Sequence, residues 1–528
     1  MAKIANRKQP TRSPRHLIPT PTDHTAFAIA LEEAEGPLIM GLDVGSTATR
    51  GSLHDARGVP IRGFRHKIPH AFTTGADGTS TIDPDQVVDE LARVLDVVTL
   101  HPGLTGRIAG VALDTFASSL VGVDERGHAT TTCFTYADRR CAPQLEELRA
   151  EVDEAEAQQL TGARLHTSYW TPRFRWLRAT DPAAVARTVR WLTIGEYAHL
   201  TWLGEAAAAT SAGAWSGLLD RRTGDWSDRM LDVARVDRST LSAIATPQQP
   251  HRGVPNVTNT RWPALAEAAW FPAIADGLGA NIGSGGADES TIVTSMATSG
   301  AMRILLHHLP EEIPSGLWCY RIDDQRSLLG GALNDVGRAV EWIGGALALD
   351  ADLAVIADRP PVADTPVVLP FFSGERSTGW AGGARAVLGD VTAASGGPAL
   401  ARGVLEGVTA AYARVAAQLI GAVLASRPQG NGAPPAVERV VCAGRVSQDL
   451  PGLRLMLADC LDRPVLPATF KRSTLRGATL LAAEVVAPGT QPAEPPLEAP
   501  CVPDPARRAH WDAVTRRFAE LYRSAVGE

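Results

Sequence analysis

Two short turns rich in glycine and hydroxyl side chains, about 250 residues apart, look like copies of one device. Residues 38–50 read LIMGLDVGSTATR, and residues 294–303 read TSMATSGAMR. In each, an apolar strand enters a Gly/Ser/Thr turn, and an extended stretch leaves it and ends on an arginine. Such a hairpin points backbone N–H groups and hydroxyl groups at one spot, which suits an oxyanion such as a phosphate. We therefore expect two halves that hold one polyphosphate from both sides.

The rest of the first half alternates between strand and helix patterns. The apolar runs Leu38–Val44, Ile108–Leu113 and Leu120–Val123 have the length and branching of buried strands. Pro84–Val98 has a helical pattern with an acidic residue in its first turn. This alternation predicts an α/β fold with a mixed sheet.

The second half repeats that alternation after Gly300. We expect a long helix at Ala399–Leu424, a strand at Val437–Cys442 and a helix at Leu453–Leu461. Before Gly300, residues 144–227 read as helical and residues 236–280 as rich in loops.

The chain of 528 residues is too long for one hydrophobic core, so two or more domains are expected. We predict a flexible tail at residues 1–36, an N-terminal domain at 37–294 and a C-terminal domain at 295–486. Residues 487–528 are expected to be a Pro/Ala-rich linker followed by one terminal helix, Arg507–Val526.

The composition excludes several classes of protein. A formal net charge of −7 gives no basic surface, so neither nucleic acid nor an anionic membrane is expected as a partner. The six cysteines form no CxxC pair, which favours reduced thiols in the cytoplasm and argues against a zinc site. No run of about 18 apolar residues occurs, so we expect no transmembrane helix.

Asp43 lies two residues before the first turn. A carboxylate there suits Mg²⁺, held directly or through water, beside phosphates bound at Gly45–Thr47. The alternative is an ordinary hairpin whose aspartate caps its own turn. A Rossmann motif and a P-loop motif are both missing from the sequence.

Asp288 follows a glycine cluster, about ten residues before the second turn. Glycines let a ligand approach the backbone, and a carboxylate beyond them suits a general base that accepts the proton of a hydroxyl group. The alternatives are a solvated loop aspartate or a helix N-cap, and the neighbouring Glu289 is a rival for the role.

Together these segments resemble the FGGY family of carbohydrate kinases, within the actin-like ATPase superfamily. The resemblance runs from about Leu38 to Glu484. The matching segments are Gly41-Leu-Asp-Val-Gly-Ser-Thr, Val111–Asp124, Tyr136-Ala-Asp-Arg-Arg, Gly285-Gly-Ala-Asp, Thr298-Ser-Gly-Ala-Met, Gly330-Gly-Ala-Leu-Asn, Pro370-Phe-Phe-Ser-Gly-Glu-Arg and Ser473-Thr-Leu-Arg-Gly-Ala.

The resemblance implies two actin-like (ribonuclease H-like) domains, each a mixed sheet flanked by helices, with a cleft between them. It implies ATP on the C-terminal side and a sugar mainly on the N-terminal side. The implied phosphate-binding residues are Gly45, Ser46, Thr47, Arg50, Thr298, Ser299 and Gly300. The implied nucleotide-binding residues are Gly331, Asn334, Gly444, Arg445 and Ser447. The implied sugar-binding residues are Ser118, Tyr136, Asp138, Arg139, His166, Tyr169 and the base Asp288.

Two residues depart from the family pattern. Arg445 stands where the adenosine region of the family has a run of glycines, so we expect it to stack on the nucleotide or crowd it. Ala297 stands in the second phosphate motif where glycine is common.

The acceptor side most resembles gluconokinases, through Leu317-Trp-Cys-Tyr-Arg-Ile-Asp and the segment Thr161–Trp176. Gluconate is an anion, and Arg139, Arg140 and Arg173 are candidates for a bidentate contact with it. Against gluconate, Ala117-Ser118 replaces the Met-His pair that gluconokinases and xylulokinases carry. Xylulose, ribulose or another polyol are therefore alternative acceptors.

The leading hypothesis is a cytoplasmic kinase for a small sugar or sugar acid that depends on ATP and Mg²⁺, with a homodimer as its candidate assembly. The second is a catalytically weak regulator that binds a sugar or a nucleotide on the same scaffold, suggested by Arg445 and the long N-terminal tail. A filament-forming or chaperone ATPase is the third, and the sugar-side segments argue against it.

Overall fold

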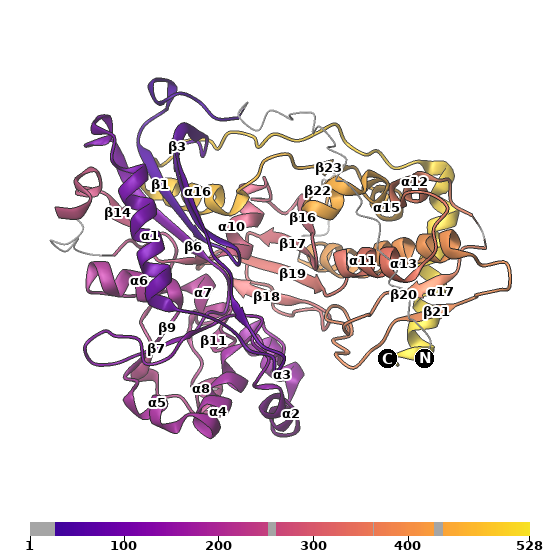
Figure 1. The fold of residues 1–528 in the computed structure, drawn as a ribbon, viewed down its shortest axis with the longest axis horizontal. Coiled ribbons are helices and arrows are strands. Elements are labelled where there is room, and N and C mark those ends of the chain that lie inside the picture. The colour runs from indigo at the N-terminus through magenta and orange to yellow at the C-terminus, as the bar shows by residue number, and fades with distance from the viewer. Residues whose placement is uncertain (1–26, 252–259, 363, 427–436, 528) are drawn as a thin grey trace, which may run out of the picture.

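The computed structural model describes residues 27–251, 260–362, 364–426 and 437–527. The chain forms two lobes, one indigo to magenta and the other mainly orange, and each contains a mixed β-sheet flanked by helices (Figure 1). The predicted α/β class is confirmed. Most of the predicted N-terminal tail lies outside the described residues.

The first sheet has the strand order β14-β6-β1-β2-β3, and β15 also pairs with β6. β1 (Leu38–Val44) is antiparallel to β2 (Ala48–His54) and parallel to β6 (Ile108–Thr115). The other strands are β3 (Pro60–Pro69), β14 (Ala269–Trp270) and β15 (Ile274–Ala275). Because β1, β6 and β15 are parallel, their carboxyl ends meet at one edge of the sheet.

The second sheet repeats this plan, with the order β18-β19-β17-β16-β22-β23. β16 (Thr291–Met296) is antiparallel to β17 (Gly300–Leu306) and parallel to β22 (Arg439–Ala443). The remaining strands are β18 (Trp318–Arg321), β19 (Ser327–Leu333) and β23 (Val465–Pro467). Both predicted hairpins are confirmed, and each lies at the same place in its sheet.

Helix α1 (Pro84–Val98) has the bounds that the sequence pattern predicts. The side chain of Asp83 caps its N-terminus by accepting from the backbone N–H of Asp85, and Pro84 occupies the first turn, where no N–H is needed. Its apolar face, which includes Val87, Leu91 and Leu95, is buried in the core of the first lobe.

A group of shorter elements covers the carboxyl-edge side of the first sheet. The helices are α2 (Ala142–Glu151), α3 (Glu154–Thr161), α4 (Trp170–Thr180), α5 (Pro182–Arg187), α6 (Ile194–Leu203), α7 (Thr210–Ala214) and α8 (Asp228–Ala234). The strands are β4 (Thr73–Thr74), β5 (Ser80–Ile82), β7 (Val121–Val123), β8 (Cys133–Phe134), β9 (Arg190–Leu192), β10 (Ala208–Ala209), β11 (Leu219–Asp220), β12 (Asp225–Trp226) and β13 (Ile244–Ala245).

The second lobe is built around one long helix, α13 (Gly397–Ala425). By length and composition alone, this helix could cross a membrane, and the expectation of no transmembrane helix stays a prediction. Its Val404, Val408, Val415 and Leu419 are nevertheless buried in the core of the second lobe. The helices around it are α11 (Gly337–Ala346), α12 (Leu353–Asp358), α14 (Arg445–Asp449), α15 (Pro451–Leu461) and α17 (Arg508–Ala525), with β20 (Val367–Leu369) and β21 (Val387–Gly389) beside them.

One helix from late in the sequence returns to the first lobe. α16 (Ser473–Val486) packs on β1 and β6 and on α10 (Asp276–Gly283), beside the indigo strands in Figure 1. Arg476 is buried in this helix, and its guanidinium donates to the carbonyl oxygens of Gly58 at 3.2 Å and Gly283 at 2.8 Å. The first sheet is thus covered on one face by residues that follow the second sheet in the sequence.

Candidate active site

The first turn is the tip of the β1–β2 hairpin. Ser46 and Thr47 are exposed there, and the N–H of Gly45 donates to the carbonyl oxygen of Ala48 at 3.1 Å. Arg50 lies opposite Asp43 in the hairpin, and its Nη1 donates to Asp43 Oδ2 at 2.7 Å. The predicted phosphate turn is therefore open to a ligand, with one acid and one base of the hairpin paired behind it.

A buried network supports this turn from below. The Nε2 of His70 lies 2.8 Å from the carbonyl oxygen of Gly45, and its Nδ1 lies 2.7 Å from Glu90 Oε2. Thr49 Oγ1 also donates to Glu90, at 2.8 Å. Both ring nitrogens of His70 thus lie against oxygen atoms, and the imidazole ties the backbone of the turn to Glu90.

The second turn, between β16 and β17, is equally open at its tip. Thr298 and Ser299 are exposed, whereas Gly300 is buried. A Cβ on Gly300 would lie 2.0 Å from the hydroxyl of Tyr412, which donates to the carbonyl oxygen of Ser295 at 2.7 Å. Glycine is therefore the residue that lets the helix α13 approach this hairpin closely.

Three aspartates gather at the carboxyl edge of the first sheet. Asp43 and Asp114 pair in the register of β1 with β6, and Asp276 directly follows β15, at the start of α10. Asp43 is 3% exposed and Asp114 is fully buried. Both carboxylate oxygens of Asp114 lack a hydrogen-bond partner within the described ranges.

The pKa values of the acids in this cluster differ from those of an acid at the surface. Burial raises the pKa of Asp276 to about 6, and the charge of Asp43 adds to the rise, while Arg303 opposes it. Burial and the charge of Asp43 raise the pKa of Asp114 well above its usual range. A buried carboxyl with a pKa near 6, at the edge of an open site, is suited to accept a proton near neutral pH.

Asp288, the predicted base, lies outside this cluster. It is exposed, and its Oδ1 accepts from the N–H of Ser290 at 2.9 Å in an ordinary turn. Asp288 precedes β16 whereas the second phosphate turn follows it, and six residues of strand span about 20 Å. The rival Glu289 accepts from the N–H of His307 at 2.8 Å. The position of Asp288 gives its assignment as base no support, and Asp276 replaces it as the candidate.

Three of the predicted sugar-binding residues face the region between the lobes. The pKa of Tyr136 is raised by partial burial and by the charge of Asp276, and that of His166 is lowered well below its usual range by burial and by Arg376. His166 is therefore neutral, and its Nδ1 accepts from the N–H of Ser168 at 3.1 Å. The hydroxyls of Tyr169 and Tyr320 lie 2.5 Å apart and join one lobe to the other.

The other sugar-side residues support loops or lie at the surface. Ser118 is buried with a φ of 57°, and its hydroxyl donates to the carbonyl oxygen of Trp215 at 2.6 Å. Asp138 accepts from the N–H of Ser80 at 2.9 Å and from Arg140 Nη2 at 2.8 Å. Arg139 is exposed.

Arg173 is fully buried and ties three of these loops together. Its guanidinium donates to the carbonyl oxygens of Ser118 and Thr135 at 2.9 Å each, and to that of Thr167 at 3.3 Å. Of the three arginines considered for gluconate, Arg140 is thus committed to Asp138, and both Nη groups of Arg173 are committed to carbonyl oxygens. The buried Nε of Arg173 has no hydrogen-bond partner among the described residues.

The predicted nucleotide-side residues fall into two groups. Gly331 is buried within β19, where a Cβ would lie 2.7 Å from Val415, and Asn334 donates to the carbonyl oxygen of Gly374 at 2.9 Å. The other group lies around the start of α14, where a Cβ on Gly444 would lie 2.3 Å from the carbonyl oxygen of Met296, and Ser447 donates to the carbonyl oxygen of Gly444 at 2.8 Å.

Arg445 points to solvent. Its side chain is 89% exposed, and its Nε lies 3.1 Å from Asp449 Oδ2 one turn later in α14. The expectation that Arg445 stacks on the nucleotide or crowds it finds no support in this conformation.

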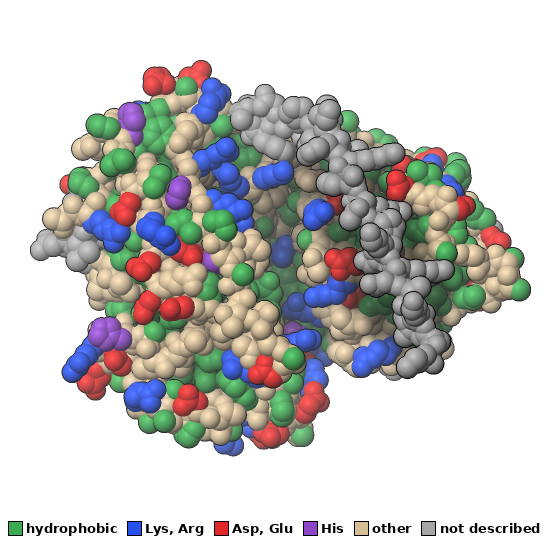
Figure 2. Space-filling model, in the orientation of Figure 1, with side chains coloured by type: hydrophobic (Ala, Val, Ile, Leu, Met, Phe, Trp, Pro, Cys, Tyr) green, Lys and Arg blue, Asp and Glu red, His purple; other side chains and the backbone are tan. Residues whose placement is uncertain are grey.

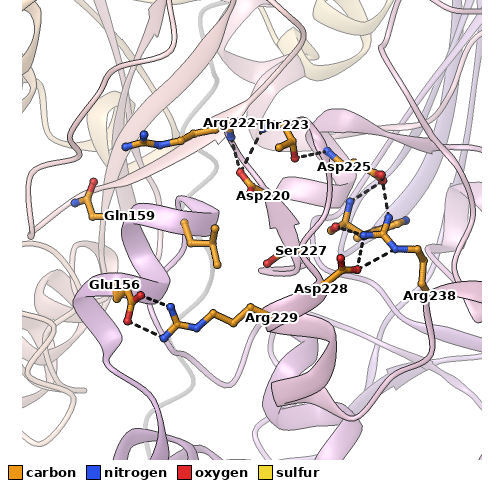
Figure 3. A pocket seen from close by; sticks show the side chains of 12 residues that line it. Glu156, Gln159, Asp220, Arg222, Thr223, Asp225, Ser227, Asp228, Arg229 and Arg238 are labelled. Atoms are coloured by element: carbon orange, nitrogen blue, oxygen red, sulfur yellow. Dashed lines mark hydrogen bonds and ion pairs between the residues drawn. The ribbon is translucent and has the colours of Figure 1, made fainter.

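A separate cavity lies away from these residues. A groove of about 590 Å³ is lined by residues of α3, the β11–β12 hairpin and α8. Its charged residues already pair with one another: Arg229 with Glu156 at 2.7 Å, and Arg238 with Asp225 at 2.9 Å and with Asp228 at 2.8 Å (Figure 3). None of the three acidic-cluster residues lines it, so we do not assign the reaction to this groove.

The space between the lobes is a better candidate for the active site than this groove, because the three aspartates lie there. Figure 2 shows a hollow between the two lobes with Lys and Arg side chains along it. No group of three or more His, Cys, Asp or Glu side chains in the described part of the chain is arranged as a complete metal site. A cation here would therefore take part of its ligands from a bound phosphate.

The expectations from the sequence assign no role to four residues that lie in this region: Asp114, Asp276, Arg303 and Arg376. Asp114 and Arg376 lie within segments that match the family pattern, but neither received a role. Asp276 lies in a stretch read as loop, and the signal that could have found it is a short apolar strand, Ile274–Ala275, that ends on an acid before a helix.

Models of protein families match both halves of the chain. Models of the N-terminal and C-terminal domains of the FGGY family of carbohydrate kinases match residues 38–261 and 295–484. The gluconokinase of Bacillus subtilis is 22% identical over 385 residues, which are 70% of this chain and 74% of that protein.

Solved structures match over nearly the whole chain. Gluconate kinase from Lactobacillus acidophilus has a TM-score of 0.82 at 22% identity and covers 92% of this chain and 98% of its own. The ligand-bound xylulose kinase from the same organism has a TM-score of 0.83 at 22% identity and covers 93% and 99%. The predicted actin-like fold of two domains is thereby confirmed.

Proposed function

Because this chain belongs to the FGGY family of carbohydrate kinases, and is thus a sugar kinase with ATP as phosphate donor, we propose that its acceptor is gluconate. The reaction transfers the γ-phosphoryl group of ATP to a hydroxyl group of the sugar acid. Two relatives are named gluconokinase or gluconate kinase, which supports this choice of acceptor. The names of others, xylulose kinases, make xylulose the main alternative.

Asp276 is the proposed general base, and its position among buried acids is the observation that carries the proposal. Its carboxylate takes the proton of the acceptor hydroxyl as that oxygen forms a bond to the γ-phosphorus. The bond from phosphorus to the bridging oxygen of ADP breaks in line with this attack, and ADP leaves with that electron pair. With a pKa of about 6, Asp276 is ionised at pH 7 yet more basic than an ordinary aspartate.

Asp43 and Asp114 are the proposed Mg²⁺ residues. The two oxygens of Asp114 are buried without a hydrogen-bond partner in the described chain, and such a carboxylate is stabilised by a nearby cation. Mg²⁺ would neutralise charge on the phosphates. Arg50 balances Asp43 when that cation is absent.

The two hairpin turns would hold the phosphates. Ser46 and Thr47 in one lobe and Thr298 and Ser299 in the other present exposed N–H and hydroxyl groups. The site therefore needs both lobes, and we propose that residues 37–294 and 295–486 act as the sugar-side and nucleotide-side domains. We also propose that the enzyme acts in the cytoplasm, and that a homodimer is its candidate assembly.

The regulator hypothesis loses support from one of its two motives. That motive was the disturbance of the nucleotide by Arg445, whose side chain is 89% exposed and paired with Asp449. The other motive, the N-terminal tail, lies mostly outside the described residues. Of the acids proposed for the reaction, Asp43 and Asp114 are buried, and Asp276 lies beside them.

The test is ADP release, coupled to NADH oxidation, with gluconate, xylulose, ribulose and glycerol as acceptors. We expect gluconate to give the highest kcat/KM. A higher kcat/KM with xylulose would replace gluconate as the acceptor, and binding of a sugar without any stimulated ADP release would support the regulator.

A further inference from the structure

Among the described residues, two arginines between the lobes find no hydrogen-bond partner for part of their guanidinium groups. Arg303 lies on β17 and Arg376 in the loop after β20. The Nε atoms of both are buried and make no hydrogen bond with any described residue. A buried N–H group without an acceptor costs roughly 1–3 kcal/mol, so two of them in one place indicate a missing acceptor.

Arg303 lies beside the proposed base. A Cβ on Gly277, the residue after Asp276, would lie 3.5 Å from Arg303 Nε. The ion pairs within 4.0 Å in the described part of the chain do not include Arg303 with Asp276. Arg303 thus lies close to Asp276, but no ion pair with Asp276 neutralises its charge.

The two guanidinium groups border one aromatic cluster. The guanidinium carbon of Arg376 lies 5.9 Å from the centre of the Trp380 ring, and Trp380 belongs to the same core cluster as Trp215, which lies beside Gly277 and Arg303. Burial lowers the pKa of Arg303, and the charge of Arg376 lowers it further, whereas Asp276 opposes this. Two cations that repel each other in a buried site are stabilised by an anion that binds both.

The aromatic side chains around the two arginines would strengthen an ion pair between these arginines and a bound anion. The rings of Trp215 and Tyr320 are 3.9 Å apart, and Tyr320 is buried together with Tyr169. His166 is neutral, because burial and the nearby arginines lower its pKa. Apolar walls exclude water, and a charge-assisted hydrogen bond is stronger there than at the surface.

The phosphates of ATP are an alternative source of the anion, and the geometry disfavours them. Arg303 is three residues along β17 from Gly300, and three residues of strand span about 10 Å. Its side chain lies on the side of β17 that carries Leu305, which packs with Trp215 and Tyr169.

We infer that Arg303 and Arg376 bind the carboxylate of the acceptor, so that the enzyme selects sugar acids over neutral sugars. This inference rests on the proposed function. The pair assigns the role of carboxylate recognition to the C-terminal half of the chain, whereas the sequence had suggested Arg139, Arg140 and Arg173.

The test compares gluconate with gluconamide, its neutral amide, in the wild type and in Arg303→Gln and Arg376→Gln. We expect the wild type to prefer gluconate by about 100-fold in kcat/KM, because the amide leaves both guanidinium groups without an anion. In each variant the KM for gluconate rises by about 30-fold, the preference over gluconamide falls below tenfold, and the KM for ATP stays within twofold. Arg376→Lys recovers part of the preference, since it keeps the charge but not the planar donor set.

Arg385→Gln is the matched control, because Arg385 is exposed and its guanidinium donates to the carbonyl oxygens of Gly383 and Ala384. It should keep wild-type constants. An equal rise in the KM for ATP, with the preference for gluconate intact, would show that the arginines serve the phosphates and overturn the inference. A neutral sugar used better than gluconate and indifferent to both variants would also overturn it, while the sugar-kinase reaction stands.

If no acceptor stimulates ADP release, the proposed function fails by itself. Calorimetric titration of gluconate then still tests the arginines: binding that Arg376→Gln does not weaken would overturn the carboxylate site.

Discussion

At the scale of single residues, Asp276 combines two properties that seldom occur together. It is buried among other acids, and it lies at the open edge of a sheet next to a phosphate turn. Its neighbour in sequence, Gly277, leaves room for the indole of Trp215, since a Cβ there would lie 3.0 Å from that ring. The carboxylate is therefore held by close packing on one side and faces the proposed substrate on the other.

Replacing Asp276 by asparagine should lower kcat by about 10²–10⁴-fold, because the acceptor hydroxyl loses its base. ATP binding, measured by calorimetry, should stay within threefold. Asp288→Asn is the matched control, since Asp288 is an exposed turn residue, and it should keep full activity. Full activity in Asp276→Asn, with loss in Asp288→Asn, would restore the assignment made from the sequence.

Asp276→Asn should also increase the free energy of unfolding at alkaline pH. A folded-state pKa of about 6 lies above the ordinary value of 3.8, so stability is lost as the pH rises through this interval. The loss amounts to about 3 kcal/mol once Asp276 is ionised. Urea unfolding at pH 8 should show Asp276→Asn to be more stable than the wild type, and at pH 4 the difference should largely disappear.

The pH profile of kcat/KM should have an acidic limb centred near pH 6. Asp276 must be ionised to accept the proton, so activity falls about tenfold for each pH unit below its pKa. A limb near pH 4, typical of an exposed carboxyl, would speak against Asp276 as the base.

At this scale the sequence predicted the phosphate turns well and the base poorly. Turns have local signals, because glycine and hydroxyl residues act through their own backbone. Asp276 follows a short apolar strand, and Asp288 follows a glycine cluster, so each has a local pattern that suits a catalytic acid. Only the pairing of β15 with β6 shows which of the two lies beside Asp114. Such long-range pairing has no local signature in one sequence.

At the scale of elements, α10 is positioned by α16 through contacts between backbones. A Cβ on Gly477 would lie 1.9 Å from the carbonyl oxygen of Gly279, and one on Gly283 would lie 1.8 Å from that of Ser473. These glycines set how closely the two helices approach. They thereby set the position of Asp276 at the start of α10.

Gly477→Ala should displace α10 and lower kcat by about 10²-fold, because misplacing a catalytic group by about 1 Å has that effect. Overpacking should also reduce the free energy of unfolding by about 1–3 kcal/mol. Gly345→Ala is the control: nothing lies within 4 Å of its Cβ in α11, so it should keep its activity and gain up to about 1 kcal/mol of stability. An active Gly477→Ala enzyme would mean that α10 tolerates the shift.

The terminal helix α17 braces the loop that carries Arg376. Tyr522 donates to Glu375 Oε2 at 2.6 Å, and Glu375 Oε1 accepts from the N–H of Gly379 at 3.1 Å. The guanidinium carbon of Arg414 lies 3.7 Å from the centre of the Tyr522 ring. The predicted terminal helix is confirmed. Its amphipathic pattern predicts a buried face but does not show that this face contacts the loop with Arg376.

Tyr522→Phe should raise the KM for the acceptor several-fold and leave the KM for ATP unchanged, because the loop with Arg376 loses a charge-assisted hydrogen bond. Tyr197→Phe is the control, since Tyr197 also donates to an acid, Asp85 at 2.5 Å, but in the first lobe behind the sheet. Equal effects of the two substitutions on the KM for the acceptor would argue against a positioning role for Tyr522.

At the scale of the whole molecule, the sequence predicted two α/β halves and a junction near residue 295. What the sequence could not predict is that the helix α16, which follows the second sheet in the chain, packs on the first sheet. α16 lies late in the chain yet buries Leu480 and Leu481 within a core that also contains Ile39 and Leu278. Its amphipathic pattern is satisfied by either sheet, and only the tertiary structure decides which one it covers.

Residues 27–294 expressed alone should therefore fail to fold cooperatively, because the apolar face beneath α16 would be exposed. Adding a peptide of residues 470–498 should restore a cooperative transition in circular dichroism. A 27–294 fragment that melts cooperatively without the peptide would show that α16 is dispensable for this lobe.

The return of α16 also sets the order of events during synthesis. Domains usually fold from the N-terminus as the chain leaves the ribosome. Here the first sheet stays uncovered on one face until residues 473–486 have emerged, after every strand of the second sheet. Until then the nascent chain presents an apolar surface that chaperones can recognise, and the two lobes mature together.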